Sequence, residues 1–250
     1  MKAIIIAAGS GKRISKDVKD IPKSLVKVNG KPIIDFQISS LNQNGIEEII
    51  LITGPNSDKF HLDNVTYVKD HDYSKHDILG SLMKAKDYLK NDVLVMYSDI
   101  IFNSKIIQQM LDSSGDISIA IDMNWDKMYE NRTEHPKSEA ENVQLNNKGK
   151  ITKIKKNIQT NNLNVGEFLG IIKFSSRGSQ IFVKKYEELI NKNSIGVFHE
   201  APVIEKAYLT DMIQELIDSK IEIEPILISE KWCEIDTMQD LKNAEILFPS

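Results

Sequence analysis

Short apolar runs separated by polar turns dominate the first hundred residues. Runs rich in β-branched residues predict buried strands, and apolar residues at helical spacing predict helices. The predicted strands are Met1–Ala8, Glu48–Thr53, Val65–Val68 and Val93–Tyr97, and the predicted helices are Pro32–Leu41 and Asp77–Leu89. This alternation indicates right-handed β-α-β units around a mostly parallel sheet.

The second half has a less regular pattern. A polar stretch with aromatic residues, Trp125–Glu141, predicts a substrate loop rather than a core element. Further strands are predicted over Asp116–Asp122, Val143–Leu145, Lys150–Lys156, Val165–Phe174, Ile221–Ile228 and Trp232–Ile235, and helices over Gln180–Asn191, Ala201–Ser219 and up to Leu247. Because no repeat or linker interrupts the pattern, we expect one domain over residues 1–250, with 123–165 as a substrate-binding loop and hairpin insertion.

Composition limits the class of protein. The 250 residues are 41% hydrophobic and 27% charged, with a net charge of −4, which disfavours general nucleic-acid binding. The one cysteine, Cys233, allows neither an intramolecular disulfide nor a cysteine-based zinc site. The apolar run Ala3–Ala8 is far too short to span a membrane, and no signal peptide is recognisable, so we expect a cytoplasmic protein. The oligomeric state is not indicated.

A glycine-rich turn follows the first predicted strand. In open α/β sheets, sites form at the carboxyl ends of strands, which here are followed by Gly9–Arg13, Thr53–Asn56 and Ser98–Asp99. Backbone N–H groups of such a turn can hold a phosphate chain, and Lys23 after Pro22 could reach the same phosphates. The alternative is a plain strand–turn–helix loop, because a lone G-x-G is a weak signal.

Two sets of carboxylates could hold a metal ion. Asp99 follows a buried strand, and Glu234 and Asp236 alternate along another, so that both face one side. Carboxylates are suitable ligands for Mg²⁺. The alternative is that Asp99 and Asp236 are turn or helix-capping residues. The five histidines show no metal-ligand spacing, so we expect them to serve packing or surface polarity.

The run from Lys2 to Leu25 resembles the nucleotidyltransferase motif of a strand, Ala-Ala-Gly-x-Gly-x-Arg and then Pro-Lys, and Gly30–Ile34 continues the likeness. The resemblance implies a Rossmann-like α/β three-layer sandwich of the nucleotide-diphospho-sugar transferase type, with a mixed, mostly parallel central sheet. It also implies catalytic roles for Arg13 and Lys23, and Mg²⁺ on Asp99, Glu234 and Asp236. The nucleotide-binding residues it implies are Ala8, Gly9, Ser10, Gly11, Lys12, Asp77, Ser81 and Ser98.

The ending Trp232–Leu241 resembles that of choline-phosphate and phosphonate cytidylyltransferases, and the region around Trp125–Glu141 resembles the acceptor region of the phosphonate subgroup. This resemblance implies acceptor-binding roles for Trp125, Tyr129, Arg132, Lys137, Glu139 and Glu167. The aromatic pair could face an ammonium group, and a carboxylate such as Glu139 or Glu141 could bind an amine. The alternatives are ordinary packing for the aromatic residues and a solvated surface charge for Arg132.

The expected reaction joins CMP from CTP to a small phosphorylated or phosphonated acceptor and releases pyrophosphate. A phosphocholine-like or aminoethylphosphonate-like acceptor is expected, and its identity stays open. One alternative is a sugar-1-phosphate nucleotidylyltransferase that uses UTP, dTTP or GTP. Another is a non-catalytic nucleotide-sensing module.

Overall fold

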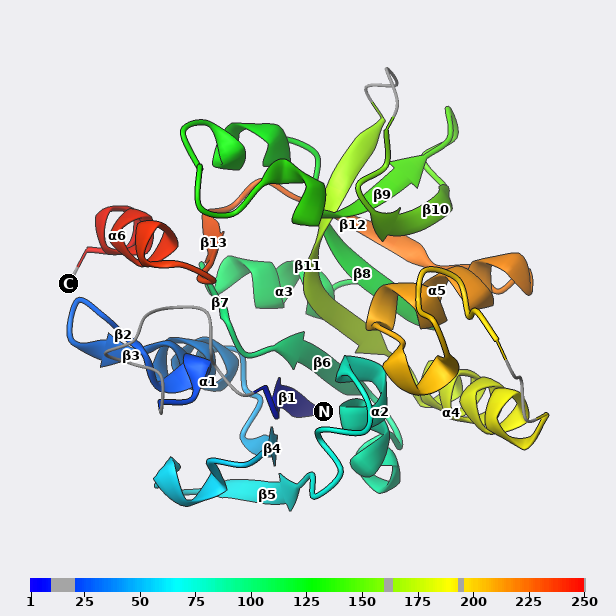
Figure 1. Cartoon of the computed structure of the whole chain (residues 1–250), viewed down its shortest axis with the longest axis horizontal. Helices are drawn as coiled ribbons and strands as arrows, with labels where there is room; N and C mark the ends of the chain where they lie inside the picture. Colours follow the sequence, from blue (N-terminus) through cyan, green and yellow to red (C-terminus); the bar gives the residue numbers. More distant parts are fainter. Residues whose placement is uncertain (10–20, 160–163, 193–195, 250) are drawn as a thin grey trace.

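The computed structural model describes residues 1–9, 21–159, 164–192 and 196–249. Its centre is a nine-stranded sheet with the strand order β10-β9-β11-β6-β1-β4-β5, and β8 and β12 branch from β11 (Figure 1). The strands are β1 Lys2–Ala7, β4 Glu48–Thr53, β5 Val65–Lys69, β6 Val93–Tyr97, β8 Ile117–Asp122, β9 Glu141–Leu145, β10 Ile151–Lys156, β11 Val165–Phe174 and β12 Glu224–Ile228. Strands β6, β1, β4 and β5 are parallel, whereas β11 is antiparallel to its neighbours.

Helices cover both faces of the sheet and make the three layers. They are α1 Ile33–Gln43, α2 Ile78–Lys84, α3 Lys105–Leu111, α4 Ser176–Asn191, α5 Leu209–Asp218 and α6 Met238–Leu247. Side chains alternate along β1: Ile4 and Ile6 belong to the core under α2, α4 and α5, and Ile5 belongs to the core under α1 and α3. The apolar run predicted as a buried strand therefore serves two cores at once.

Strand β11 is long enough to leave the sheet centre and extend past the site. Its second half, from Ile171, pairs with β6, and its first half pairs with β9 beyond the carboxyl end of β6. Gly170, at the bend, has φ +72°, and a Cβ there would lie 2.3 Å from the ring of Tyr97. The arm of β9, β10 and the start of β11 thus overhangs the carboxyl edge of the parallel strands (Figure 1).

A small sheet brings two distant carboxylates together. Strand β7, Ile100–Phe102, pairs with β13, Trp232–Glu234, and the amide of Ile235 donates to the carbonyl of Asp99 at 2.9 Å. A second short pair joins β2 Lys27–Val28 to β3 Lys31–Pro32. The 3-10 turns are η1 Lys23–Leu25, η2 Ser57–Lys59, η3 Lys86–Tyr88, η4 Trp125–Tyr129, η5 Lys137–Glu139 and η6 Ile204–Lys206.

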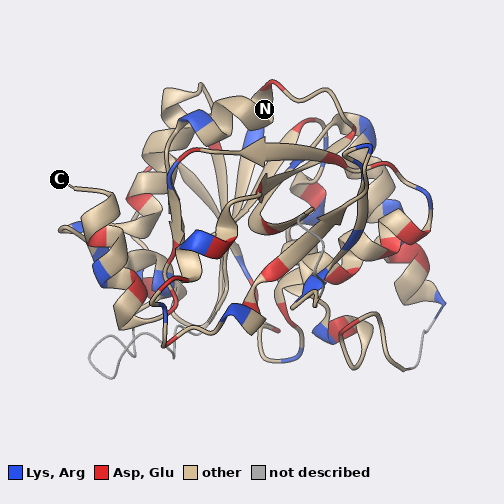
Figure 2. Ribbon diagram, turned by 90° about the horizontal axis from the view of Figure 1, so that it is seen from above, with Lys and Arg blue, Asp and Glu red and all other residues tan. Residues whose placement is uncertain are grey.

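Most predicted elements are confirmed, with corrections at two helices. The helix expected over Ala201–Ser219 begins only at Leu209, after the separate turn η6, and the helix expected over Asp77–Leu89 ends at Lys84 and continues as η3. Among the described residues, no helix is long and apolar enough to cross a membrane. Acidic and basic residues are interspersed over the ribbon (Figure 2).

Candidate active site

A cavity of about 490 Å³ lies at the carboxyl ends of β1 and β6. Ala8 and Gly9 follow β1 and line it, and Ser98 and Asp99 follow β6 and line it. The predicted strand-end rule therefore holds for two of the three segments. The third, Thr53–Asn56, is not part of the cavity wall.

Lys23 lies between two carboxylates in the centre of this cavity. Its Nζ donates to Asp99 Oδ2 at 2.8 Å and also to Asp236 Oδ1. Burial alone would lower the pKa of Lys23, but the charges of Asp99 and Asp236 outweigh it and raise the pKa above its usual value. Lys23 therefore stays charged at neutral pH.

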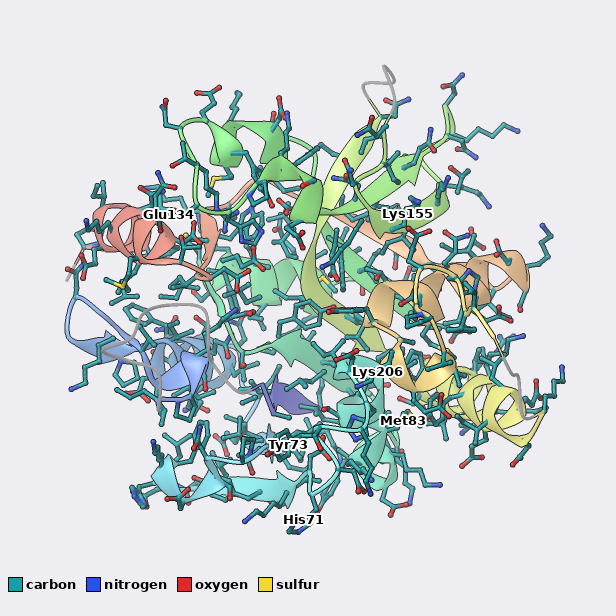
Figure 3. The ribbon with its side chains drawn as sticks, viewed as in Figure 1. His71, Tyr73, Met83, Glu134, Lys155 and Lys206 are labelled. Carbon is teal, nitrogen blue, oxygen red and sulfur yellow. The ribbon has the colours of Figure 1, made fainter. Side chains whose placement is uncertain are left out.

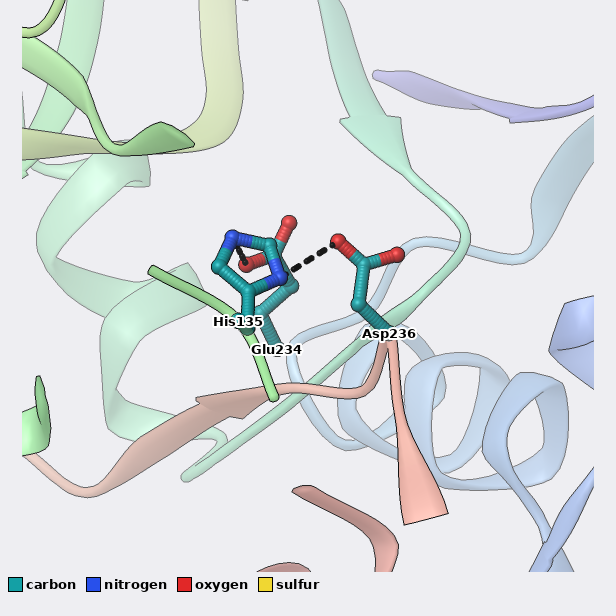
Figure 4. Close-up of side chains that lie close together, drawn as sticks. All are labelled: His135, Glu234 and Asp236. Carbon is teal, nitrogen blue, oxygen red and sulfur yellow. Dashed lines mark ion pairs between the residues drawn. The ribbon is translucent and has the colours of Figure 1, made fainter. Parts of the chain in front are cut away.

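His135 lies close to Glu234 and Asp236 (Figure 4) and contacts the Asp236 oxygen that Lys23 does not. Its Nδ1 lies 3.1 Å from Asp236 Oδ2, and its Nε2 lies 3.8 Å from Glu234 Oε2. The three residues offer ligand atoms within 4.8 Å of one another. His135 was expected to serve packing or to lie at the surface; the fold, not the local spacing, brings it to this cluster in the cavity wall.

The donor set fits a divalent cation. Asp99 Oδ1 is buried and has no hydrogen-bond partner among the described residues, and Asp99, Glu234 and Asp236 all line the cavity. Burial, and then the charges of Asp236 and Asp99, raise the pKa of Glu234 to about 7. Carboxylates crowded in this way are stabilised by a cation, so these three would hold a divalent metal ion.

Other carboxyls line the end of the cavity under the β9–β11 arm. Tyr129 Oη donates to Glu167 Oε1 at 2.6 Å, and Tyr97 Oη donates to Glu141 Oε2 at 3.1 Å. Burial raises the pKa of Glu167 and of Glu141 to about 8. Glu167 is only 4% exposed, and its Oε2 has no hydrogen-bond partner among the described residues. A buried carboxyl oxygen without a partner in a cavity wall leaves hydrogen-bonding capacity for a ligand there.

Four of the six expected acceptor residues lie outside the cavity wall, and of the six only Glu139 and Glu167 line it. Arg132 is held by Asp240 at 2.5 Å and Glu234 at 3.4 Å, with its guanidinium group over Tyr129. Lys137 pairs with Asp126 and lies over the ring of Trp125, whose Nε1 donates to the carbonyl of Val165. The aromatic pair thus already has protein cations on its faces, and Tyr129 and Arg132 contact the wall residues Glu167 and Glu234 from outside the cavity.

Asp77 and Ser81 line the opposite end of the cavity, together with His76 and Tyr73. Asp77 precedes α2, but its side chain makes no capping hydrogen bond. The segment that carries Tyr73 is joined to η6, because Lys206 Nζ donates to the carbonyl of Ser74 at 3.3 Å (Figure 3). Ser10, Gly11, Lys12 and Arg13 lie outside the described residues.

The sequence patterns missed several residues of the wall: His76, Tyr97, His135, Lys156 and Tyr208. Tyr97 stands directly before the predicted Ser98–Asp99 pair, so its place at a strand end was a usable signal. Lys156 reaches the cavity from β10 of the arm and His135 from the segment between η4 and η5, and no local pattern indicates the path of either segment.

A parallel sheet with carboxylates and a lysine at its carboxyl edge is the architecture of a nucleotide-using transferase. The family model described as MobA-like NTP transferase domain matches residues 3–221, so the chain belongs to that family and is a nucleotidyltransferase.

Relatives and solved structures agree on this class. A CTP:phosphoglutamine cytidylyltransferase of Campylobacter jejuni is 28% identical over 97% of this chain and 98% of that protein. A choline-phosphate cytidylyltransferase of Streptococcus pneumoniae is 35% identical over 42% of this chain and 47% of that protein. The solved structure of an inositol-1-phosphate CTP transferase from T. maritima has a TM-score of 0.73, with 19% identity over 98% of this chain and 94% of that chain. The last comparison establishes the three-layer fold.

Proposed function

We propose that the chain transfers CMP from CTP to a small acceptor that carries a phosphate or phosphonate, and releases pyrophosphate. One observation carries the proposal. The cluster of Lys23, Asp99 and Asp236 lies between two ends of the cavity. One end is lined by the backbone after β1 and by Ser81, and the other is lined by Glu141 and Glu167. We refer to these as the nucleotide end and the acceptor end. The cytidylyltransferase relatives support the choice of nucleotide.

The reaction needs no protein nucleophile. An oxygen of the acceptor phosphate attacks the α-phosphorus of CTP, the bond from that phosphorus to the bridging oxygen of the β-phosphate breaks, and pyrophosphate leaves. Lys23 supplies positive charge beside the reacting phosphates, and the cavity walls hold both substrates in reach of each other. A divalent cation on Asp99, Glu234 and Asp236 would neutralise phosphate oxygens.

The acceptor end favours a molecule with N–H groups. Glu167 Oε2 is buried without a described partner, and the Glu141 carboxyl lies near it in the same wall. An amino or amide group can donate to such oxygens, whereas a quaternary ammonium group has no N–H to donate. Phosphorylated amino or amide compounds, or an aminoalkylphosphonate, therefore fit better than phosphocholine.

An acceptor screen tests the proposal. Pyrophosphate release is measured with Mg²⁺ and each of CTP, UTP, dTTP and GTP against phosphoglutamine, 2-aminoethylphosphonate, phosphocholine, inositol-1-phosphate and glucose-1-phosphate. We expect CTP with an N–H-bearing acceptor to give the highest kcat/KM. Highest activity with glucose-1-phosphate and UTP, dTTP or GTP would identify a sugar-1-phosphate nucleotidylyltransferase instead. Tight CTP binding without turnover of any acceptor would indicate a nucleotide sensor.

A further inference from the structure

Asp70 is a buried carboxylate that the proposed reaction does not use. It follows β5, is 1% exposed and does not line the cavity. Its Oδ2 accepts the hydroxyl of Ser81 at 2.8 Å, and its Oδ1 accepts the amide of Asp72 at 3.0 Å. The same Oδ1 lies 3.2 Å from His76 Nε2. Asp70 thus holds two residues of the nucleotide end, His76 and Ser81, from behind.

The hydrogen bond to Asp70 decides how Ser81 can meet a ligand. A serine hydroxyl has one proton and two acceptor lone pairs, and an ionised carboxylate only accepts. The Ser81 proton is therefore committed to Asp70, and Ser81 offers the cavity only acceptor capacity.

The neighbouring backbone leaves Ser81 little freedom to turn away. Its own amide donates to the carbonyl of Asp77 within the first turn of α2. The ring of His76 packs on Gly80, where a Cβ would lie 2.5 Å from the ring. The backbone around Ser81 is thus held by α2 and by the His76 ring on Gly80, and its hydroxyl is held by Asp70.

We propose that Asp70 is a positioning residue that selects cytosine over uracil by fixing Ser81 as a hydrogen-bond acceptor. The inference rests on the proposed function, because it takes a pyrimidine nucleoside triphosphate to occupy this end. The two bases differ at C4, where cytosine carries an amino donor and uracil a carbonyl acceptor, and at N3, which accepts in cytosine and carries a proton in uracil; the proposal places Ser81 at C4. A Ser81 oxygen that can only accept binds the amino group of cytosine. It would face the carbonyl oxygen of uracil, which is a second acceptor, and the two partial negative charges would repel each other.

The test is a comparison of nucleotide binding, which needs no acceptor. Dissociation constants for CTP, UTP and pyrimidin-2-one ribonucleoside triphosphate, which lacks the exocyclic group, are measured by calorimetry with Mg²⁺. The wild-type chain should bind CTP at least about tenfold more tightly than either analogue. In Ser81→Ala this preference should shrink to about twofold or less, and Ser81→Thr, which keeps the hydroxyl, should restore it.

Asp70→Asn tests the positioning role. An asparagine can donate to the Ser81 oxygen, which frees the hydroxyl proton to point into the cavity, so UTP binding should improve relative to CTP. Asp116→Asn is the matched control, since Asp116 accepts the Ser175 hydroxyl at the same 2.8 Å, at the start of β8 away from the cavity. The control should leave the CTP-to-UTP ratio unchanged. If Asp70→Asn does not fold, Asp70→Glu, which keeps the charge but moves the oxygens, gives the same comparison.

The outcomes separate the two proposals. A wild-type chain that binds UTP as tightly as CTP contradicts the proposed nucleotide. A wild-type preference for CTP that survives in both Ser81→Ala and Asp70→Asn overturns the inference alone. A preference lost in Ser81→Ala but kept in Asp70→Asn also overturns it, because Asp70 would then be only structural.

Discussion

The two ends of the cavity are built on different principles. At the nucleotide end, Asp70 holds the neighbouring side chains: Ser81 donates its hydroxyl proton to Asp70, and the His76 ring lies against the same carboxylate. At the acceptor end, Glu167 accepts one tyrosine hydroxyl and keeps a second oxygen without a described partner. The first arrangement presents groups in a fixed orientation, and the second leaves hydrogen-bonding capacity for the ligand. If the proposed function holds, selectivity for the nucleotide is built into the fold, whereas recognition of the acceptor is completed by the acceptor itself.

The same contrast holds for the backbone. The nucleotide end lies on parallel strands whose connections return to a common edge, and the acceptor end lies on the β9–β11 arm that overhangs this edge. Between them, β7 and β13 hold Asp99 beside Asp236. Substitutions in this centre should affect both substrates, and substitutions at either end should affect one.

The largest effect is expected at Asp236. Asp236→Asn removes a charge that Lys23 and a divalent cation would share, so kcat/KM should fall by about a thousandfold or more for the nucleotide and the acceptor alike. Steady-state pyrophosphate release and the midpoint of thermal unfolding are measured together. A folded variant with near wild-type turnover would remove Asp236 from the proposed mechanism.

Lys23→Met should have the next largest effect. The variant keeps the length of the side chain but loses the ammonium group beside the phosphates, and kcat should fall by about a hundredfold. Lys155→Met is the matched control. Lys155 lies on β10 (Figure 3), donates to Glu200 and is not part of the cavity wall. Equal activities of the two variants would show that Lys23 has no role in charge stabilisation.

Glu167 should make stability depend on pH. Burial raises its pKa from the usual 4.5 to about 8, so the folded state holds this proton more tightly than the unfolded state. That contribution to stability is complete below about pH 4.5 and is lost as the pH rises to about 8. Urea unfolding is measured for the wild type and for Glu167→Gln at both pH values; from pH 5 to pH 8 the free energy of unfolding of the wild type should fall by about 3.5 kcal/mol more than that of the variant. A constant difference between the two chains would contradict the raised pKa.

The same substitution should separate the two ends kinetically. In Glu167→Gln, the KM for an N–H-bearing acceptor should rise about tenfold and the KM for CTP should stay within about twofold, because the exchanged side chain lines only the acceptor end. The control is Glu187→Gln. Glu187 lies on α4 and forms an exposed ion pair with Lys86. Parallel changes in both KM values would indicate that the ends are not independent.

The smallest effect is expected at Trp125. Trp125→Phe loses the hydrogen bond to Val165 but no part of the cavity wall, so the free energy of unfolding should fall by about 1 kcal/mol while the acceptor KM changes less than about twofold. A tenfold rise in that KM would restore the role in acceptor binding that the sequence resemblance implies.

The parts of the fold that sequence patterns predict well are those whose burial is decided locally. Strands β4, β6 and β11 have the predicted bounds, because continuous apolar runs end at glycine, proline or polar turns. Strands β7 and β13 have three residues each, and the pairing of two such short segments far apart in the chain leaves no periodic signal.

The candidate site divides in the same way. Asp99 and Asp236 were predicted, because each follows a strand in a recognisable motif. They are linked by Lys23, which is 213 positions from Asp236 in the chain. The approach of His135 to Asp236 depends on the path of a segment rich in 3-10 turns. Arg132 was expected at the acceptor, but Asp240 and Glu234 compensate its charge inside the protein. Such tertiary pairing is decided by packing and has no signature in residue spacing.

The ammonium group of Lys23 serves as an internal counterion. Asp99 and Asp236 would repel each other without it, so the centre of the cavity is partly neutralised before any ligand enters. A triphosphate offers Lys23 alternative acceptors, and when Lys23 turns to them, both carboxylates become available to a metal ion at the same moment. Lys23 therefore couples the affinities for nucleotide and metal, so that each should bind more tightly in the presence of the other than alone.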